Sequence, residues 1–366
     1  MDPRSIGMIG AGAWGTAVAK VLAENGHQVQ MWSYEQDVTH AINNSHENRT
    51  YLQGVMLPEL IRASTNLSEV AESKDYLILA VPSLYLIETV KQMVRVSSVQ
   101  EGSTPIAILT KGFIDGPGGP GLLTSAVENY LPGFYKDNLV YISGPSHAEE
   151  VARGKITGLI SASKHAKYSI QFRELLRGPT LLVFSSLDIV GVQAAAALKN
   201  VVAIAFGMLD ALKELNDKFG DNTESLLLAA GLNEIQLLGN ALGASHPQTF
   251  TSIAAVGDLD VTCRSIYGRN RRFGREIIHE RKISHFSNLQ DILQHIEQIG
   301  YLPEGVAASK HAFSIARNRK LKTPIINAVH SILNREAEPF EAIVDLLKKL
   351  SGVEADHFVA PEKTEL

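Results

Sequence analysis

The sequence predicts an α/β fold in two domains: a doubly wound sheet over residues 1–188 and an all-helical C-terminal domain over residues 189–366. Three observations predict this. An apolar strand runs directly into a glycine-rich turn near residue 10, short apolar runs then alternate with helical stretches, and from about Asp188 only helical periodicity remains. Continuous rather than alternating apolar runs are typical of parallel strands that are covered on both faces.

The turn after the first strand has the spacing of a dinucleotide-binding loop. Residues 6–9 form the strand, Gly10, Gly12 and Gly15 follow as G-x-G-x-x-G, and residues 16–24 have the composition of a helix. Gly10 permits the tight turn, Gly12 lets the backbone approach a pyrophosphate, and Gly15 allows close packing of helix on strand. Glycine clusters also make ordinary loops, but the strand before this one and the helix behind it favour a Rossmann-like nucleotide site.

The end of the second strand, residues 28–34, bears on the choice of nucleotide. NAD-selective sites usually carry Asp or Glu about 20 residues past the glycines, where the carboxylate binds the ribose 2′-hydroxyl. Ser33 occupies this region, with Tyr34 beside it and Glu35 one step further. No carboxylate stands at the strand tip to repel a 2′-phosphate, and no Arg is there to pair with one. We therefore expect use of both NAD and NADP, with NADPH in the reductive direction.

Five more apolar runs complete the predicted sheet: residues 75–81, 105–110, 138–143, 158–162 and 181–185. Pro82-Ser83, Lys111-Gly112 and Gly144-Pro145-Ser146 follow the first three, and ligands bind at the carboxyl ends of strands in open α/β sheets. Residues 40–58 are predicted to hold a helix end and a long loop. The glycine- and proline-rich residues 116–121 are predicted to form a mobile surface loop.

The second half is expected to be helical throughout. Its most apolar stretch, residues 192–212, contains Lys199, Asn200 and Asp210, which favours a buried helix over a membrane span. Residues 354–366 are polar and are expected to form a frayed tail.

The overall composition argues against several classes of protein. The chain has 366 residues, of which 45% are hydrophobic, and a formal net charge of -5. This charge disfavours general binding to nucleic acid or to anionic membranes, which attract basic surfaces. The single Cys263 cannot form an internal disulfide and is expected to pack as a small hydrophobe. The N-terminus has no signal-peptide pattern, so we expect a cytoplasmic protein without stable membrane insertion.

Lys199 lies beside Asn200 in an otherwise apolar helical run, residues 194–206. Burying an ammonium group is costly unless the group has a partner or a task, although a lysine can instead extend its amine to water. Apolar residues on nearly every helical face favour burial here. Desolvation would then lower the pKa of Lys199 toward the range that is useful for acid–base catalysis.

Residues 257–275 combine a carboxylate, a hydroxyl, amide and guanidinium groups in one short span. Asp258, Thr262, Arg269 and Asn270 are its candidate ligand-binding residues. Guanidinium groups fit phosphate oxygens, and Thr and Asn add neutral donors. The segment therefore indicates a phosphorylated small molecule rather than nucleic acid. Some of the remaining arginines are expected to be plain surface charges: Arg271, Arg272 and Arg275.

Several motifs together resemble those of the bacterial NAD(P)-dependent glycerol-3-phosphate dehydrogenases. They occur in the order and approximate spacing of that family over nearly the whole chain: GAGAWGTA (10–17), AVPS (80–83), TKG (110–112), SGPSHAEEV (143–151), LKNV (198–201), GDL (257–259) and GRNRRFG (268–274). No single motif would be specific, whereas the set is.

The resemblance implies that a homodimer reduces dihydroxyacetone phosphate to sn-glycerol 3-phosphate with NAD(P)H, for glycerophospholipid synthesis and without a metal. It implies that Lys199 is the proton donor and acceptor, with Lys111 and Asp258 as its catalytic neighbours. The implied cofactor positions are Gly10, Gly12, Ala13, Trp14, Gly15, Tyr34, Lys111, Ala148, Arg269, Leu302 and Glu304. The implied substrate positions are Lys111, Gly144, Ser146, Lys199, Asn200, Asp258, Thr262, Gly268, Arg269 and Asn270.

Two positions depart from the family pattern. Gly268 stands where relatives often have Ser, and Leu302 stands where many have Val. Gly268 is expected to offer its backbone N–H to the substrate but has no hydroxyl. His147 is an alternative acid because histidine titrates near neutrality, but its place in a Gly-Pro-Ser loop favours a peripheral role.

Two other functions fit parts of the sequence. A 3-hydroxyacid dehydrogenase or ketopantoate-type reductase also joins a nucleotide domain to a helical domain, but residues 257–275 favour a phosphate-bearing substrate. A redox-sensing module that binds nucleotide without catalysis would have no need of Lys111, Lys199 and Asp258 together.

Overall fold

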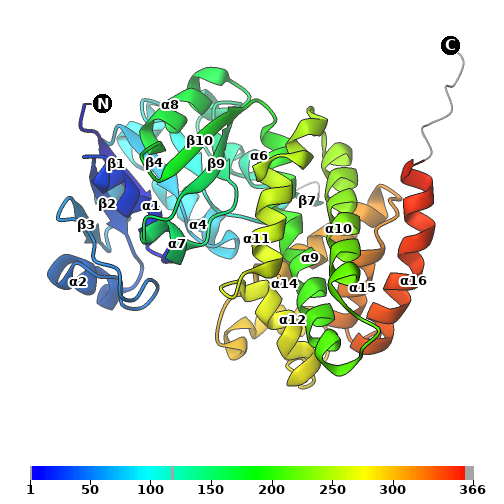
Figure 1. Ribbon diagram of the computed structural model, residues 1–366. Helices are drawn as coiled ribbons and strands as arrows, with labels where there is room; N and C mark the ends of the chain where they lie inside the picture. Colours follow the sequence, from blue (N-terminus) through cyan, green and yellow to red (C-terminus); the bar gives the residue numbers. More distant parts are fainter. Residues whose placement is uncertain (1, 117–118, 359–366) are drawn as a thin grey trace, which may run out of the picture. The chain divides into compact units, whose positions relative to one another are not determined.

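A computed structural model describes residues 2–116 and 119–358 of the chain. The chain forms two compact units (Figure 1). The first contains residues 1–193 together with 244–254, and the second contains residues 194–243 together with 255–366. The chain therefore returns to the first unit after it has entered the second. The division into domains at 188/189 stays a prediction.

The first unit is built on a sheet of eight strands, which lie in the order β10-β9-β8-β5-β4-β1-β2-β3. The strands are β1 (Ser5–Ile9), β2 (Gln28–Trp32), β3 (Ile61–Ser64), β4 (Tyr76–Leu79), β5 (Ile106–Ile108), β8 (Val140–Ser143), β9 (Thr157–Ala162) and β10 (Leu181–Ser186). All pairs are parallel except β8 with β9. The strand order reverses between β1 and β4, which is where nucleotides bind in doubly wound sheets. The predicted α/β class is confirmed.

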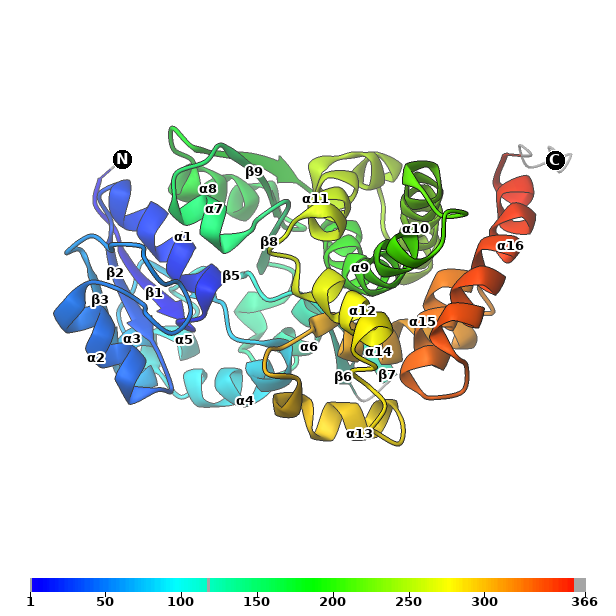
Figure 2. The same cartoon turned by 60° about the horizontal axis from the view of Figure 1, so that its bottom comes forward.

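Helices cover the sheet on both faces, and its central strands β1, β4, β5 and β8 are buried over almost their whole length (Figures 1 and 2). The helices of the first unit are α1 (Ala13–Glu24), α2 (Gln36–Ser45), α3 (Leu67–Ala71), α4 (Ser83–Met93), α5 (Ser97–Gln100), α6 (Leu123–Glu128), α7 (Ala148–Ala152) and α8 (Ala166–Leu176). Helix α1 packs Val18 and Leu22 against strand residues such as Met8 in one buried cluster. It ends before Gly26, whose φ of 89° is left-handed and stops the helix.

Two sequence predictions for the first unit are wrong in part. The glycine-rich residues 116–121 do not form a simple loop, because β6 (Phe113–Gly116) and β7 (Gly119–Leu122) pair as an antiparallel hairpin. Pairing of main-chain groups needs no apolar side chains, so composition did not reveal it. Residues 117–118 lie outside the described residues. Strand β3 was also missed, because its sequence, IRAS, is not a continuous apolar run.

The second unit consists of helices and short turns in all of its described residues. The helices are α9 (Ile189–Leu215, which begins in the first unit), α10 (Asp221–Leu242), α11 (Asp258–Arg264), α12 (Arg269–His279), α13 (Leu289–Gln294), α14 (Glu304–Asn318), α15 (Pro324–Leu333) and α16 (Pro339–Phe358). Because α16 continues to Phe358, the tail predicted from residue 354 begins inside a helix. Residues 359–366 lie outside the described part of the chain.

Helix α9 is long and apolar enough to cross a membrane by length and composition, and 94% of its most apolar window is buried inside the protein. Burial of this kind is what a core helix of a folded domain shows.

The buried carboxylate of Asp188 fixes the returning segment to the first unit. Its Oδ1 accepts the backbone N–H groups of Gly191 (3.0 Å) and Ser245 (3.1 Å). Its Oδ2 accepts the hydroxyl of Thr249 at 2.7 Å. A single side chain thus holds the start of α9 to residues that lie more than fifty positions further along the chain.

Candidate functional site

The glycine loop in the first unit has the geometry that its sequence predicts. Gly10 has a φ of 121°, and a Cβ there would lie 2.8 Å from the Ala80 carbonyl carbon. A Cβ on Gly15 would lie 2.4 Å from the Gly10 carbonyl oxygen. A Cβ on Gly12, by contrast, would meet nothing within 4 Å. Gly10 and Gly15 are therefore required by packing, whereas Gly12 faces open space that a ligand could fill.

Unused donors lie at the start of α1, beside this space. Gly12 is the N-cap, α1 begins at Ala13, and Thr16 makes the first helical bond to the Gly12 carbonyl. Among the described residues, the Gly12 N–H has no acceptor, and the buried indole Nε1 of Trp14 has none either. A helix N-terminus with free N–H groups favours a phosphate. These residues fit the pyrophosphate of a dinucleotide.

The residue that follows β2 is Ser33 rather than a carboxylate. Ser33 is buried, and its hydroxyl accepts the backbone N–H of Glu35 at 3.2 Å. The Glu35 carboxylate accepts the Tyr51 hydroxyl at 2.9 Å. Burial and this contact raise the pKa of Tyr51 to about 12, so the phenol remains a donor. Tyr34 is 87% exposed. Of the expected cofactor positions, Tyr34 therefore lies exposed directly after β2, between the buried Ser33 and the hydrogen-bonded Glu35.

Lys111 lies with two of the other predicted residues of the first unit. Its Nζ donates to the Gly144 carbonyl (3.3 Å) and to the Ser146 hydroxyl (3.2 Å). Ser146 in turn donates to the Gly144 carbonyl at 2.8 Å. These residues follow β5 and β8, which are neighbours in the sheet, and Ala148 opens α7 directly afterwards. His147 is the N-cap residue of α7.

In the second unit, Lys199 is buried with two of its predicted neighbours. Only 5% of Lys199 is exposed, and its Nζ bonds to Asp258 Oδ1 and, at 2.7 Å, to Thr262 Oγ1. Thr262 also donates to the Asp258 carbonyl at 2.6 Å. These two contacts fix the direction in which the amine points, and the expectation that burial lowers the pKa of Lys199 stays a prediction.

Asn200 presents an unused donor next to this cluster. Its Oδ1 accepts Asn270 Nδ2 at 3.0 Å, and Asn270 Oδ1 accepts the Gly305 N–H at 2.9 Å. These bonds tie together α9, α12 and the start of α14. The Nδ2 of Asn200 is buried and has no partner among the described residues. A buried amide donor costs free energy unless something accepts it, so this atom points to a polar ligand.

The side chain of Arg269 is available to bind an anion. The backbone N–H of Gly268, which was expected to bind substrate, is not available. Arg269 is exposed at the first position of α12 and makes no side-chain hydrogen bond or ion pair within the described residues. The Gly268 N–H, however, donates to the Ser265 carbonyl at 3.1 Å, so it cannot also bind substrate. A Cβ on Gly268 would lie 2.7 Å from the Thr262 carbonyl oxygen, which leaves no room for a serine here without a backbone shift.

The last two predicted cofactor positions lie near Asn270. Glu304 is the first residue of α14 and precedes Gly305, and Leu302 lies in the preceding turn. Both are partly buried.

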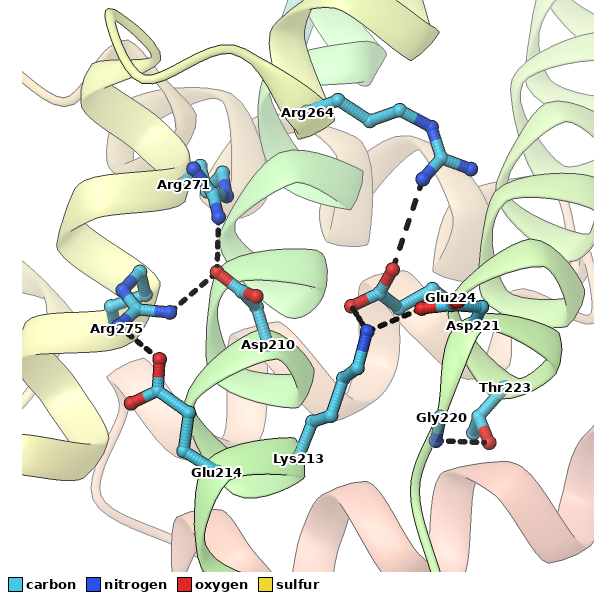
Figure 3. A network of polar contacts seen from close by, with 10 residues as sticks. All are labelled: Asp210, Lys213, Glu214, Gly220, Asp221, Thr223, Glu224, Arg264, Arg271 and Arg275. Carbon is cyan, nitrogen blue, oxygen red and sulfur yellow. Dashed lines mark hydrogen bonds and ion pairs between the residues drawn. The ribbon is translucent and has the colours of Figure 1, made fainter.

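Two other arginines of α12, Arg271 and Arg275, hold this helix to α9 (Figure 3). Asp210 Oδ2 pairs with Arg271 at 2.5 Å and with Arg275 at 2.6 Å. Close approach of the two helices needs Gly274, whose Cβ would lie 2.1 Å from the Ile204 carbonyl oxygen. Arg271 and Arg275 are therefore structural. Arg272 is the most exposed of the three, at 64% of its side chain, but it pairs with Glu276 at 2.6 Å.

Cys263 is fully buried, and burial raises the pKa of its thiol well above the ordinary range. It packs as a small hydrophobe, as predicted, and is no nucleophile.

One residue that contacts the glycine loop was missed. Asn48 is fully buried and donates to the Ala11 carbonyl at 2.7 Å and to Thr16 Oγ1 at 2.8 Å. It lies in residues 40–58, which were assigned only to a helix end and a loop. Nothing local distinguishes it there from Asn43 and Asn44.

Comparisons with known proteins agree over both halves of the chain. A family model for the N-terminus of NAD-dependent glycerol-3-phosphate dehydrogenase matches residues 5–169, and a model for the C-terminus matches residues 188–344. A curated glycerol-3-phosphate dehydrogenase (NAD(P)+) from Treponema denticola is 54% identical over 349 residues, which are 94% of this chain and 98% of the relative. The Bacillus subtilis protein of that name is 33% identical and covers 94% of each chain.

Solved structures agree with this result. The crystal structure of glycerol-3-phosphate dehydrogenase from Coxiella burnetii has a TM-score of 0.81 and 31% identity, covering 94% of this chain and 99% of that one. A ketopantoate reductase from Ralstonia eutropha has a TM-score of 0.54 at 15% identity, which shows a shared fold only. With both halves matched and full-length relatives above 50% identity, the chain belongs to the NAD-dependent glycerol-3-phosphate dehydrogenase family, whose members are NAD(P)-dependent oxidoreductases.

Proposed function

We propose that this protein reduces dihydroxyacetone phosphate to sn-glycerol 3-phosphate, with Lys199 as the group that gives the new hydroxyl its proton. The observation that carries the proposal is the buried cluster around Lys199. An ammonium group fixed by Asp258 and Thr262 lies next to the unused amide donor of Asn200. A ketone oxygen that becomes an alkoxide needs both a donor and a proton.

Each residue then has a separate task. When bound, the reduced nicotinamide supplies the hydride to the carbonyl carbon. Lys199 stabilises the negative charge that develops on the carbonyl oxygen and then donates a proton to it. Asp258 keeps the amine protonated and directed. Asn200 donates a hydrogen bond to a substrate oxygen, and the free guanidinium of Arg269 pairs with the phosphate. In the reverse reaction Lys199 accepts the proton.

The nucleotide is proposed to bind in the first unit through Gly10, Gly12, Ala13, Trp14, Gly15, Tyr34, Lys111 and Ala148. The open space at Gly12 and the unpartnered Trp14 donor support this assignment. The residue that follows β2 is Ser33 rather than a carboxylate, which supports the expectation that this position does not repel a 2′-phosphate. We therefore propose that both NADH and NADPH serve.

Replacement of Lys199 tests the mechanism. Lys199→Met should lower kcat by about 10²–10⁴-fold, the usual contribution of a general acid. The affinity for NADPH should be unchanged, since the nucleotide is assigned to other residues. Lys213→Met on the same helix is the matched control, because Lys213 is a surface lysine paired with Asp221 and Glu224, and it should keep full turnover. Ordinary turnover by Lys199→Met would remove this residue from the mechanism.

The substrate is tested by following NADPH or NADH oxidation with dihydroxyacetone phosphate. Turnover of ketopantoate or a 3-hydroxyacid, and none of dihydroxyacetone phosphate, would support the alternative reductase instead. The homodimer, the cytoplasmic location and the supply of glycerol 3-phosphate for lipid synthesis are further proposals from the family resemblance. Light scattering on the purified protein tests the first of these.

A further inference from the structure

We propose that Asn48 is a positioning residue for the cofactor: it holds the Ala11–Gly12 peptide so that the Gly12 N–H is presented to the pyrophosphate. The Asn48 side chain is fully buried. Its Nδ2 donates to the Ala11 carbonyl (2.7 Å) and to Thr16 Oγ1 (2.8 Å), which uses both of its N–H groups. Its Oδ1 accepts the Tyr51 N–H at 3.1 Å.

The surroundings fix which way the amide points. The Ala11 carbonyl can only accept a hydrogen bond and the Tyr51 N–H can only donate one, so a flipped amide would lose both contacts. Thr16 Oγ1 makes a longer contact of its own to the Ala11 carbonyl, at 3.4 Å. Asn48 and Thr16 thus both donate hydrogen bonds to the Ala11 carbonyl from the buried side of the loop.

The orientation of a carbonyl determines that of the next N–H. In a trans peptide the C=O of one residue and the N–H of the following residue point in opposite directions, and no described peptide bond is cis. With the Ala11 oxygen held toward Asn48, the Gly12 N–H must point away from the protein interior. That N–H has no acceptor among the described residues, and the adjoining space is open. A preorganised donor binds a phosphate better than one that must first rotate into place.

Without Asn48, the peptide between Ala11 and Gly12 would be free to rotate. The lack of a Cβ on Gly12, which lets the phosphate approach, also lets the Ala11–Gly12 peptide adopt several orientations. Asn48 removes this freedom from outside the loop. The inference rests on the dinucleotide cofactor of the family and not on the proposed substrate, so its test leaves dihydroxyacetone phosphate out.

The test measures the binding of two ligands to the full-length protein. ADP-ribose contains the adenosine and the pyrophosphate, whereas adenosine lacks the phosphates. Asn48→Ala should raise the Kd for ADP-ribose by about tenfold, as expected for one misdirected hydrogen bond to a charged group, and should change the Kd for adenosine by less than about twofold. Asn44→Ala is the matched control, because Asn44 is exposed on α2 and bonds only within that turn.

A second pair of variants keeps the test decisive if Asn48→Ala fails to fold. Thr16→Val preserves the side-chain volume but removes the hydroxyl that Asn48 binds, whereas Thr16→Ser retains that hydroxyl. Thr16→Val should weaken the binding of ADP-ribose but not that of adenosine, whereas Thr16→Ser should bind ADP-ribose as tightly as wild type does. Unchanged ADP-ribose affinity in folded variants would overturn the proposal. So would an equal loss for adenosine and ADP-ribose, because a purely structural role would disturb the whole nucleotide site.

Discussion

Replacing Glu234 by Gln is expected to change how the stability of the second unit depends on pH. Glu234 is 2% exposed on α10, and its two carboxyl oxygens accept the N–H groups of Ile325 (2.6 Å) and Ile326 (3.1 Å) at the start of α15. Burial raises the pKa of Glu234 from 4.5 to about 8, against the two hydrogen bonds, which lower it. The group therefore holds an extra proton in the folded protein through the neutral range.

The sign and size of the effect follow from these two pKa values. An acid with a raised pKa in the folded state stabilises the fold at low pH, and this contribution is lost as the pH rises from about 4.5 to about 8. At 1.36 kcal/mol per pKa unit, wild type should lose about 3 kcal/mol relative to Glu234→Gln between about pH 6 and about pH 9.

Urea unfolding of both proteins, followed by circular dichroism across this pH range, measures the difference in the free energy of unfolding. All other titrating groups are shared, so the difference isolates Glu234. Amide hydrogen exchange at Ile325 and Ile326 reports the same event locally. The reasoning fails if the difference in unfolding free energy stays constant, or if wild type gains stability as the pH rises. Either result would mean that the hydrogen bonds from Ile325 and Ile326 lower the pKa of Glu234 by at least as much as burial raises it.

Three glycine substitutions should separate binding from packing. Gly12→Ala has a compatible φ of -70° and an open space for its methyl group, so it should melt like wild type but weaken NADPH binding by about tenfold or more, because the methyl occupies the proposed pyrophosphate site. Its matched control, Gly15→Ala, meets the Gly10 carbonyl oxygen at 2.4 Å and should instead lose about 1–3 kcal/mol of stability. Thermal melts and NADPH titrations on the pair distinguish the two effects, and a Gly12→Ala protein with wild-type affinity would contradict the assigned phosphate position. Gly274→Ala should cost a similar amount of stability, since its Cβ would lie 2.1 Å from the Ile204 carbonyl oxygen; an unaltered melting temperature would show that α12 can move away from α9 at no cost.

Local patterns in the sequence predicted most of the sheet. The glycine motif identified β1, its turn and α1, and the apolar runs identified β2, β4, β5, β8, β9 and β10 to within a few residues. Apolar runs do not indicate strand direction, so the antiparallel pairing of β8 with β9 could not be predicted. Strand β3 was missed because only two of its four residues are apolar, and the β6–β7 pair was missed because its glycine- and proline-rich sequence contains no apolar run.

In the candidate site, too, local sequence patterns did not predict which distant residues contact one another. The sequence indicated that Lys199 is buried, but its direct partner Asp258 is 59 positions away, and only the folded chain reveals their contact. The Gly268 N–H was expected to be free and is bound to a backbone carbonyl. Asn48 had no local signal at all, because its role depends on which carbonyl the fold places beside it.

The return of residues 244–254 to the first unit limits how this protein can be divided. A fragment that ends near residue 193 would keep the buried Asp188 carboxylate but lose Ser245 and Thr249, two of its donors. A buried carboxyl group that loses its hydrogen-bond donors destabilises the fold. Chimeras that exchange a nucleotide-binding half between relatives will therefore need this short segment transplanted as well, with three junctions in place of one.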